Sequence, residues 1–263
     1  MATQDYKGKW ALVLGGSSGL GLATVLKLAK EGMHICVVHR TRRAGLTYFE
    51  EAMTSLKTTG TKVMSFNLDA TKPESRESII NTISSEIGIG TFKVLVHSIA
   101  KGNLKPFFDR ETQTLSNTDL HITLEAMAVS LYDWVSAFAK AELFSTQARV
   151  IAFTSEGSTK AWKNYGAVAA AKAALEAIIR NIALEFSTIG LTANAIQAGV
   201  TNTESLRLIP GSEKMKEYSK LRNPFNRLTT PEDVANAVFL LCQNEASWIN
   251  GTTIPVDGGE HMC

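Results

Sequence analysis

Glycine and serine residues near the amino terminus have the spacing of a turn that binds phosphate. The turn follows a short apolar run and reads Gly15-Gly16-Ser17-Ser18-Gly19-Leu20-Gly21, after which a helical pattern of apolar residues begins. The glycines let the backbone turn sharply, and the free N–H groups and dipole at the helix start favour negative charge. Glycine clusters also occur in tight turns that bind nothing. The order of strand, glycine turn and helix nevertheless predicts a dinucleotide pyrophosphate site, with Ser17 and Ser18 as additional donors.

The residues after the second predicted strand indicate which dinucleotide binds there. They read His39-Arg40-Thr41-Arg42-Arg43, at the place where a carboxylate would hold the ribose hydroxyls of NAD. No acid is present, and the arginines suit the 2′-phosphate of NADP, with Arg40 as the best candidate and Arg42 or Arg43 in support. The alternative is a solvated basic helix start. Asp69 either accepts a hydrogen bond from the adenine amino group or caps a helix.

A serine, a tyrosine and a lysine follow the fifth predicted strand. Ser155 comes directly after the strand, Tyr165 stands ten positions later, and Lys172 lies on an alanine-rich helix. In isolation, this tyrosine reads as a residue packed at a helix start and this lysine as a surface lysine. Their chemical meaning depends on the motifs around them.

The elements that must position these residues follow a regular rhythm along the chain. Short β-branched runs alternate with longer helical patterns, which is typical of repeated βαβ units. Several runs are continuously apolar, as expected for strands covered on both faces. The sequence predicts one α/β domain over residues 1–263, with a doubly wound, Rossmann-like parallel sheet of seven strands. The predicted strands cover residues 10–14, 34–38, 62–66, 93–97, 149–153, 192–196 and 252–256.

Composition argues against several other classes of function. The formal net charge is +2, and no Lys/Arg run is long enough to coat a nucleic acid. No apolar run approaches membrane-spanning length and the amino terminus lacks a signal-peptide pattern, so we expect a cytoplasmic protein that does not bind membranes. The five histidines are scattered and the three cysteines are far apart, so we expect no metal site.

The motifs taken together resemble the short-chain dehydrogenase/reductase family over essentially the whole chain. The glycine turn, Ser155, the tyrosine and lysine, AsnAlaIleGlnAlaGly at 194–199 and IleProValAspGlyGly at 254–259 carry the resemblance. The ordinary family tyrosine position holds Val168, and Tyr165 lies one turn earlier. This Tyr-x6-Lys spacing and ValHisSerIleAla at 96–100 resemble the enoyl-acyl-carrier-protein reductase branch. The absence of the usual helix asparagine, with Ala128 near its place, and Ala198 before Gly199 agree with that branch. Ser155 instead resembles the carbonyl reducers.

The resemblance implies an NADPH-dependent enoyl-thioester reductase of fatty-acid synthesis. A seven-residue offset places Tyr165 about 10.5 Å along the helix from Lys172 and on the same face. The displaced phenol suits an enolate oxygen remote from the β-carbon that accepts hydride, while Lys172 holds the nicotinamide ribose and Ser155 contacts the substrate carbonyl. Further residues implied to bind the cofactor are Ala70, Ser98, Ile99, Ala100, Gly199, Val200 and Thr203. The alternatives are a 3-oxoacyl-thioester or other carbonyl reductase and a non-catalytic NADP(H)-binding regulator.

The segment at about 200–228 has the composition of a substrate-binding lid. Apolar residues alternate there with charged ones, as a lid over an acyl chain requires. Its net charge of +3 comes from Arg207, Lys214, Lys216, Lys220, Arg222 and Arg227 against Glu204, Glu213 and Glu217. We expect this basic rim, with Lys101 and Lys105, to attract a substrate linked to an acidic acyl carrier protein or to coenzyme A. The alternative is a solvated basic surface without a partner.

The helix predicted over 166–186 is apolar on more of its circumference than one sheet face covers. A second buried contact is therefore expected, and packing against a copy of itself would provide one. We expect a homo-oligomer, with a tetramer as the expected form.

Overall fold

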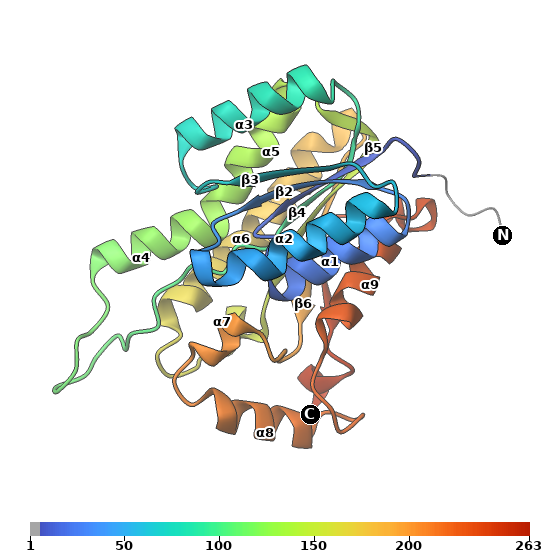
Figure 1. Cartoon of the computed structure of the whole chain (residues 1–263). Helices are drawn as coiled ribbons and strands as arrows, with labels where there is room; N and C mark the ends of the chain where they lie inside the picture. The colour runs from blue at the N-terminus through green and yellow to red at the C-terminus, as the bar shows by residue number, and fades with distance from the viewer. Residues whose placement is uncertain (1–5) are drawn as a thin grey trace.

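The computed structural model describes residues 6–263, which form a parallel sheet of seven strands (Figure 1). The strand order is β3-β2-β1-β4-β5-β6-β7, so the winding reverses between β1 and β4. This confirms the predicted doubly wound α/β fold. The strands are β1 Trp10–Leu14, β2 His34–His39, β3 Val63–Asn67, β4 Phe92–His97, β5 Phe144–Thr154, β6 Thr192–Ala198 and β7 Thr253–Val256.

Helices cover both faces of the sheet because its strands are apolar on both sides. Trp10, Leu12 and Leu14 of β1 pack in one core with α3, α5 and α6, while Ala11 and Val13 pack in a second core with α1, α2 and α9. The helices are α1 Gly19–Lys30, α2 Arg43–Thr58, α3 Pro73–Glu86, α4 Asn117–Leu124, α5 Ser130–Lys140, α6 Gly166–Glu185, α7 Glu204–Arg207, α8 Ser212–Arg222 and α9 Pro231–Cys242. A π-helical turn at Glu125–Val129 joins α4 to α5.

β5 is longer than its apolar run predicts. It begins at Phe144, and its first residues pair with Phe92 before a register irregularity leads into the regular ladder. Gln147 in this part has a φ of 54°, a left-handed conformation within the strand. The polar residues of this irregular part conceal it from a prediction based on apolar runs.

α6 packs within its own chain on more than one side. It lies against β5 and β6 of the sheet and also against α4, α5 and the π-helical turn. Part of the second buried contact expected for this helix is therefore intramolecular. Leu184 near its end remains exposed, and packing against a second copy stays a prediction.

Three segments extend beyond the carboxyl ends of the strands. The loop 98–116 leads into α4, and the short helices α7 and α8 lie below the sheet in Figure 1. These segments and the strand ends enclose the space described next. Among residues 6–263, no helix has the length and apolar character to cross a membrane.

Candidate active site

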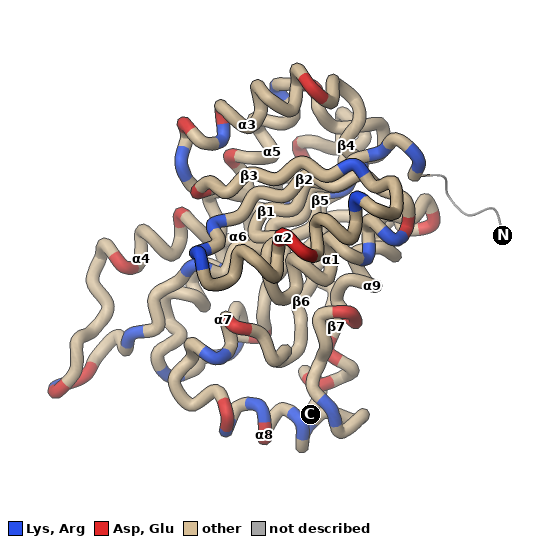
Figure 2. Tube along the Cα trace, viewed as in Figure 1, with Lys and Arg blue, Asp and Glu red and all other residues tan. Residues whose placement is uncertain are grey.

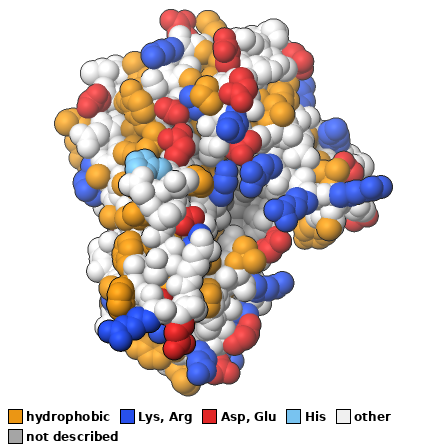
Figure 3. All heavy atoms as spheres, turned by 90° about the vertical axis from the view of Figure 1, so that its left-hand side faces the viewer, with side chains coloured by type: hydrophobic (Ala, Val, Ile, Leu, Met, Phe, Trp, Pro, Cys, Tyr) orange, Lys and Arg blue, Asp and Glu red, His pale blue; other side chains and the backbone are white. Residues whose placement is uncertain are grey.

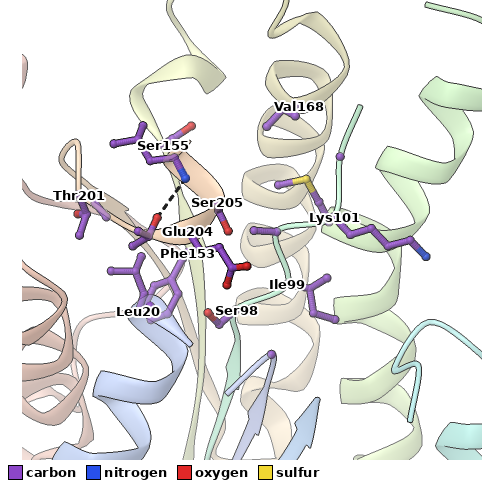
Figure 4. Close-up of a pocket in the computed structure, with 18 of the residues that line it drawn as sticks. Leu20, Ser98, Ile99, Lys101, Phe153, Ser155, Val168, Thr201, Glu204 and Ser205 are labelled. Atoms are coloured by element: carbon purple, nitrogen blue, oxygen red, sulfur yellow. Dashed lines mark hydrogen bonds between the residues drawn. The ribbon is translucent and has the colours of Figure 1, made fainter. Parts of the chain in front are cut away.

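A cavity of about 430 Å³ lies where the carboxyl ends of the strands meet α7 and α8. Doubly wound sheets bind ligands at this edge, where the direction of winding reverses. Figure 3 shows a hollowed face with Lys and Arg side chains along one side of the hollow. Figure 4 shows Ser98 and Ile99 after β4, Ser155 after β5, and Glu204 and Ser205 of α7 around the same space.

Most of the predicted site residues line this cavity together. They are Gly15, Ser17, Ser18, Gly19, Leu20, His39, Arg40, Asp69, Ala70, Ser98, Ile99, Ala100, Ser155, Tyr165, Lys172, Gly199, Val200 and Thr203. Gly21, Arg42 and Arg43 do not line it. Gly21 lies below the turn, where a Cβ would stand 2.3 Å from the Gly15 carbonyl oxygen, so its glycine is needed for packing. Arg42 is exposed at the start of α2.

The glycine turn has the geometry that an anionic group requires. Gly15 has a φ of 82°, and a Cβ there would stand 2.4 Å from the carbonyl oxygen of Ser98, so only glycine fits. Ser18 is the N-cap of α1 but makes no side-chain cap hydrogen bond, and the first turn holds no acid. The N–H groups of this helix start and the Ser18 hydroxyl are therefore available to a pyrophosphate.

Arg40 stands at the mouth of the cavity and contacts Asp69. Its Nη1 donates to Oδ2 of Asp69 at 3.1 Å, and its side chain is 59% exposed. Burial by itself raises the pKa of Asp69, but hydrogen bonds from Thr71 and the charges of Lys101 and Arg40 outweigh it and lower that pKa to about 2. Because Asp69 accepts from both N and Oγ1 of Thr71, it also stabilises the turn that precedes α3.

His39 is held by its own neighbours at the end of β2. Its Nδ1 lies 2.7 Å from Oγ1 of Thr41, and its ring packs 4.3 Å from that of Phe49. Burial lowers its pKa. His39 and Arg40 both line the cavity at this end of β2.

The hydroxyl groups of Ser155 and Tyr165 meet inside the cavity. Ser155 Oγ lies 3.3 Å from Tyr165 Oη. Tyr165 is the N-cap of α6, after Asn164 with a φ of 64°, and its ring packs on Gly157, where a Cβ would stand 2.5 Å from the ring. The backbone of Tyr165 is displaced along the helix as predicted, but as the N-cap residue Tyr165 directs its side chain so that its hydroxyl lies beside that of Ser155. Burial raises the pKa of Tyr165, so the phenol keeps its proton at neutral pH, although the hydrogen bond with Ser155 acts in the opposite direction.

Lys172 of α6 is buried and also lines the cavity. Its Nζ donates to the Phe153 carbonyl oxygen at 2.6 Å, near the end of β5. Burial lowers its pKa to about 8, with the charge of Glu176 acting in the opposite direction. Thr154 in turn donates to Glu176 at 2.6 Å. The ammonium therefore lies at the strand end that carries Ser155.

The structure adds residues that sequence reasoning missed. The Trp162 ring packs 5.1 Å from that of Tyr165, and Met127 of the π-helical turn lines the same apolar side of the cavity as Val168. His97 is buried, and its Nε2 lies 2.9 Å from Ser130 Oγ. Burial and the charge of Lys172 lower the pKa of His97 to about 3. His97 belongs to the ValHisSerIleAla motif at 96–100, but nothing in the sequence around Trp162 or Met127 signals that they line the cavity.

Many of the predicted basic side chains near the cavity are already paired. Lys101 contacts Asp69, and Lys105 contacts Asp119. Within the predicted lid, Lys216 pairs with Glu213, Arg222 with Glu156 and Glu260, and Arg227 with Asp233. Figure 2 shows both signs of charge along α8. Thr203 caps α7 and lies against Gly19 of the glycine turn.

The described residues contain no group of three or more His, Cys, Asp or Glu side chains arranged to hold a metal ion. The cavity is lined by the hydroxyl residues Ser155 and Tyr165, the buried Lys172 and the glycine turn at the start of α1. A doubly wound parallel sheet with these parts is typical of nicotinamide-dependent oxidoreductases.

Comparison with known proteins gives the family. A family model described as "Enoyl-(Acyl carrier protein) reductase" matches residues 15–261. The chain belongs to the short-chain dehydrogenase/reductase family, whose members are NAD(P)-dependent oxidoreductases. A tropinone reductase homolog of Arabidopsis thaliana is 31% identical over 256 residues, covering 97% of this chain and 92% of the relative. A Sus scrofa protein named dehydrogenase/reductase SDR family member 4 is 27% identical, covering 97% and 88%.

Solved structures share the fold. A short-chain dehydrogenase from Burkholderia cenocepacia in complex with NADP superposes with a TM-score of 0.81 at 22% identity, covering 98% of this chain and 100% of that one. An enoyl-acyl-carrier-protein reductase (NADH) from Aquifex aeolicus gives a TM-score of 0.81 at 24% identity, covering 98% of each chain. Proteins with different named reactions are thus equally similar in fold.

Proposed function

We propose that this protein is an NADPH-dependent carbonyl reductase in which Ser155 and Tyr165 hold the substrate carbonyl oxygen. The 3.3 Å separation of their hydroxyl oxygens carries the proposal. If a substrate oxygen lay about 2.7 Å from each hydroxyl oxygen, the angle between the two hydrogen bonds at that substrate oxygen would be about 75°, and carbonyl oxygens accept hydrogen bonds over a broad range of directions. The resemblance to tropinone reductase homologs supports the same reaction class.

Each residue then has a chemical role in the reduction. The bound dinucleotide supplies hydride to the carbonyl carbon. Tyr165 donates its phenolic proton to the oxygen, and Ser155 donates a second hydrogen bond as that oxygen gains charge. Lys172 holds the nicotinamide ribose hydroxyls, and its positive charge favours the phenolate left after proton transfer. Solvent then returns a proton to Tyr165.

The preference for NADPH rests on Arg40 and on the absence of an acid after β2. Arg40 is exposed at the cavity, and its pairing with Asp69 is a surface contact, which contributes only about 0–1 kcal/mol. A 2′-phosphate can therefore replace the carboxylate as its partner.

The substrate end of the cavity favours an apolar molecule. Leu206, Ile209 and Met215 line it from the segment that carries α7 and α8, and Trp162 and Met127 line it from the other side. A ketone with a hydrocarbon body, or a 3-oxoacyl thioester, fits this lining.

Reduction of an enoyl thioester is the second candidate. It is favoured by Val168 at the ordinary tyrosine position and by the description of the matching family model. In this case Tyr165 stabilises the enolate oxygen while hydride goes to the β-carbon. The carrier-linked or coenzyme A-linked substrate remains part of this candidate, with the exposed Lys214 and Lys220 as the basic groups that face solvent.

Parallel assays separate the two candidates. Oxidation of NADPH is measured with acetoacetyl thioester, crotonyl thioester and a cyclic ketone at equal concentrations. The proposal expects turnover with the ketone or acetoacetyl compound and little with crotonyl thioester. Turnover confined to crotonyl thioester would reject the carbonyl assignment in favour of the second candidate.

A further inference from the structure

The segment between Val200 and Arg222 is closed at both ends by one buried carboxylate. Oε2 of Glu260 accepts the backbone N–H of Val200 at 3.2 Å, and Oε1 of Glu260 accepts from Nη2 of Arg222 at 2.8 Å. The Glu260 side chain is 2% exposed. The segment 200–222 includes α7 and α8 and supplies apolar lining to the cavity, and we call it the cover of the cavity. Glu260 holds both ends of this cover.

Arg222 also contacts the chain beside the catalytic serine. Its Nη2 and Nη1 donate to Oε2 and Oε1 of Glu156 at 2.5 and 3.2 Å, and Glu156 directly follows Ser155. The Arg222 and Glu156 side chains are 12% and 11% exposed. Two-point contacts of this kind fix orientation as well as distance. The position of α8 is thereby linked to the position of the Ser155 backbone.

The surroundings hold this arginine in one place. Its guanidinium lies 5.6 Å from the centre of the Tyr218 ring on the preceding turn of α8. The next residue, Asn223, donates to the Asp257 carbonyl oxygen at 2.7 Å, which ties the end of α8 to the same carboxyl-terminal turn. Lys160 contacts Oε1 of Glu156, the oxygen that also accepts from Nη1 of Arg222. Nη1 of Arg222 also donates to the backbone oxygen of Cys263 at 3.4 Å. Because Arg222 already has these partners as well as Glu156 and Glu260, it is not free to bind an acidic substrate.

We propose that Arg222 is a positioning residue that, by pairing with Glu156 and Glu260, holds the segment 200–222 over the substrate end of the cavity and holds Ser155 in place. The part that concerns Ser155 rests on the proposed carbonyl reduction. The part that concerns the cover rests on the contacts alone. A buried arginine between two carboxylates cannot be removed without leaving uncompensated charge, so its loss should loosen the segment.

Hydrogen exchange measured by mass spectrometry on the free protein tests the cover. The variants are Arg222→Met and Arg222→Lys, with Arg227→Met as the matched control because Arg227 pairs with Asp233 outside the cavity. We expect amides of α7 and α8 to exchange at least about tenfold faster in Arg222→Met, with an intermediate effect for Arg222→Lys, which retains one cation but not the fork. Exchange in α8 equal to that of the control would overturn the proposal.

Kinetics test the link to Ser155. Per NADPH-binding site, Arg222→Met should raise the KM for the ketone about tenfold and lower kcat. The Kd for NADPH should rise less than this KM, because Val200 and Thr203 of the segment line the cofactor site but the glycine turn and Arg40 lie outside the segment. A merely structural loss would reduce the number of binding sites and leave KM unchanged. If Arg222→Met fails to fold, Arg222→Lys decides: faster exchange confined to 200–222 supports the proposal, and faster exchange throughout the sheet rejects it. If the wild-type protein reduces no ketone, the proposed function fails, but the hydrogen-exchange comparison still tests whether Arg222 holds the segment 200–222 in place.

Discussion

The paired hydroxyls make a quantitative prediction about two single variants and their combination. Tyr165→Phe removes the proton donor, which contributes about 10²- to 10⁴-fold in general acid catalysis. Ser155→Ala removes a donor to the oxygen that gains charge, a loss of about 10²- to 10³-fold where such a donor is preorganised. In the proposed carbonyl reduction both groups donate to one substrate oxygen, because their own oxygens lie 3.3 Å apart.

Donors that address one oxygen do not contribute independently. Once Tyr165 cannot give its proton, less charge develops for Ser155 to stabilise. The double variant should therefore lose about 10³- to 10⁴-fold, well below the product of the two single losses. Each factor of ten corresponds to about 1.4 kcal/mol, so the coupling energy should exceed about 1.4 kcal/mol.

The assay is NADPH oxidation with saturating cofactor, reported as kcat/KM for the best ketone. Ser205→Ala is the matched control, because Ser205 lines the same cavity from α7 and has no hydrogen bond to Tyr165. The Kd for NADPH, measured by fluorescence, should stay within about threefold in all variants, which separates chemistry from misfolding. Losses that multiply, or a Ser155→Ala variant within about threefold of wild type, would refute the shared-oxygen geometry and favour the remote enolate oxygen.

Two further predictions concern cofactor binding, and a third concerns the packing of the glycine turn. Arg40→Ala should raise the Kd for NADPH about 10- to 100-fold and the Kd for NADH much less, since one charge-assisted contact is worth about 1.5–3 kcal/mol. Arg42→Ala, at an exposed position, is the control, and equal effects of the two variants would contradict the role proposed for Arg40. Burial lowers the pKa of Lys172 to about 8 in the free protein, so the side chain is a cation below that pH and neutral above it. The Kd for NADPH should therefore be constant below pH 7 and rise above pH 8, and this rise should be absent in Lys172→Met. Gly15 and Gly32 both have a positive φ, which costs an alanine about 1–2 kcal/mol at either position, but only at Gly15 would the new Cβ meet Ser98. Gly15→Ala should therefore lower the thermal midpoint much more than Gly32→Ala, and equal shifts would show that the contact with Ser98 is relieved.

The sequence predicts best those features that depend on the backbone. The bounds of β1 follow from an apolar run with polar neighbours, and the cofactor cradle follows from glycines whose φ angles and close contacts exclude other residues. The first half of β5 has no such signal. The position of the Tyr165 hydroxyl also has none, because it depends on the bend at Asn164 and on the space above Gly157. These are tertiary contacts, and a helical wheel that starts at the tyrosine cannot contain them.

The cluster around Arg222 shows the same limit more strongly. Its members Glu156, Arg222 and Glu260 lie far apart in the chain and belong to no periodic pattern. From composition, Arg222 contributes to a basic rim that attracts acidic partners. In the structure its charge is matched by two carboxylates, as that of Arg227 is matched by Asp233. Net charge therefore overstates the attraction that this segment can exert.

The reaction depends on where the reacting atoms lie, and the residue spacing constrains this only loosely. Moving a tyrosine three positions back along a helix shifts its Cα by about 4.5 Å along the helix axis, which is less than the length of a tyrosine side chain. A cap residue has the freedom to turn that length back toward the serine, as Tyr165 does. The spacing between tyrosine and lysine therefore separates the two reaction classes only if the serine is also absent. In this chain the serine is present and in contact with the phenol, so the retained Ser155 carries more weight for the substrate class than the displaced Tyr165.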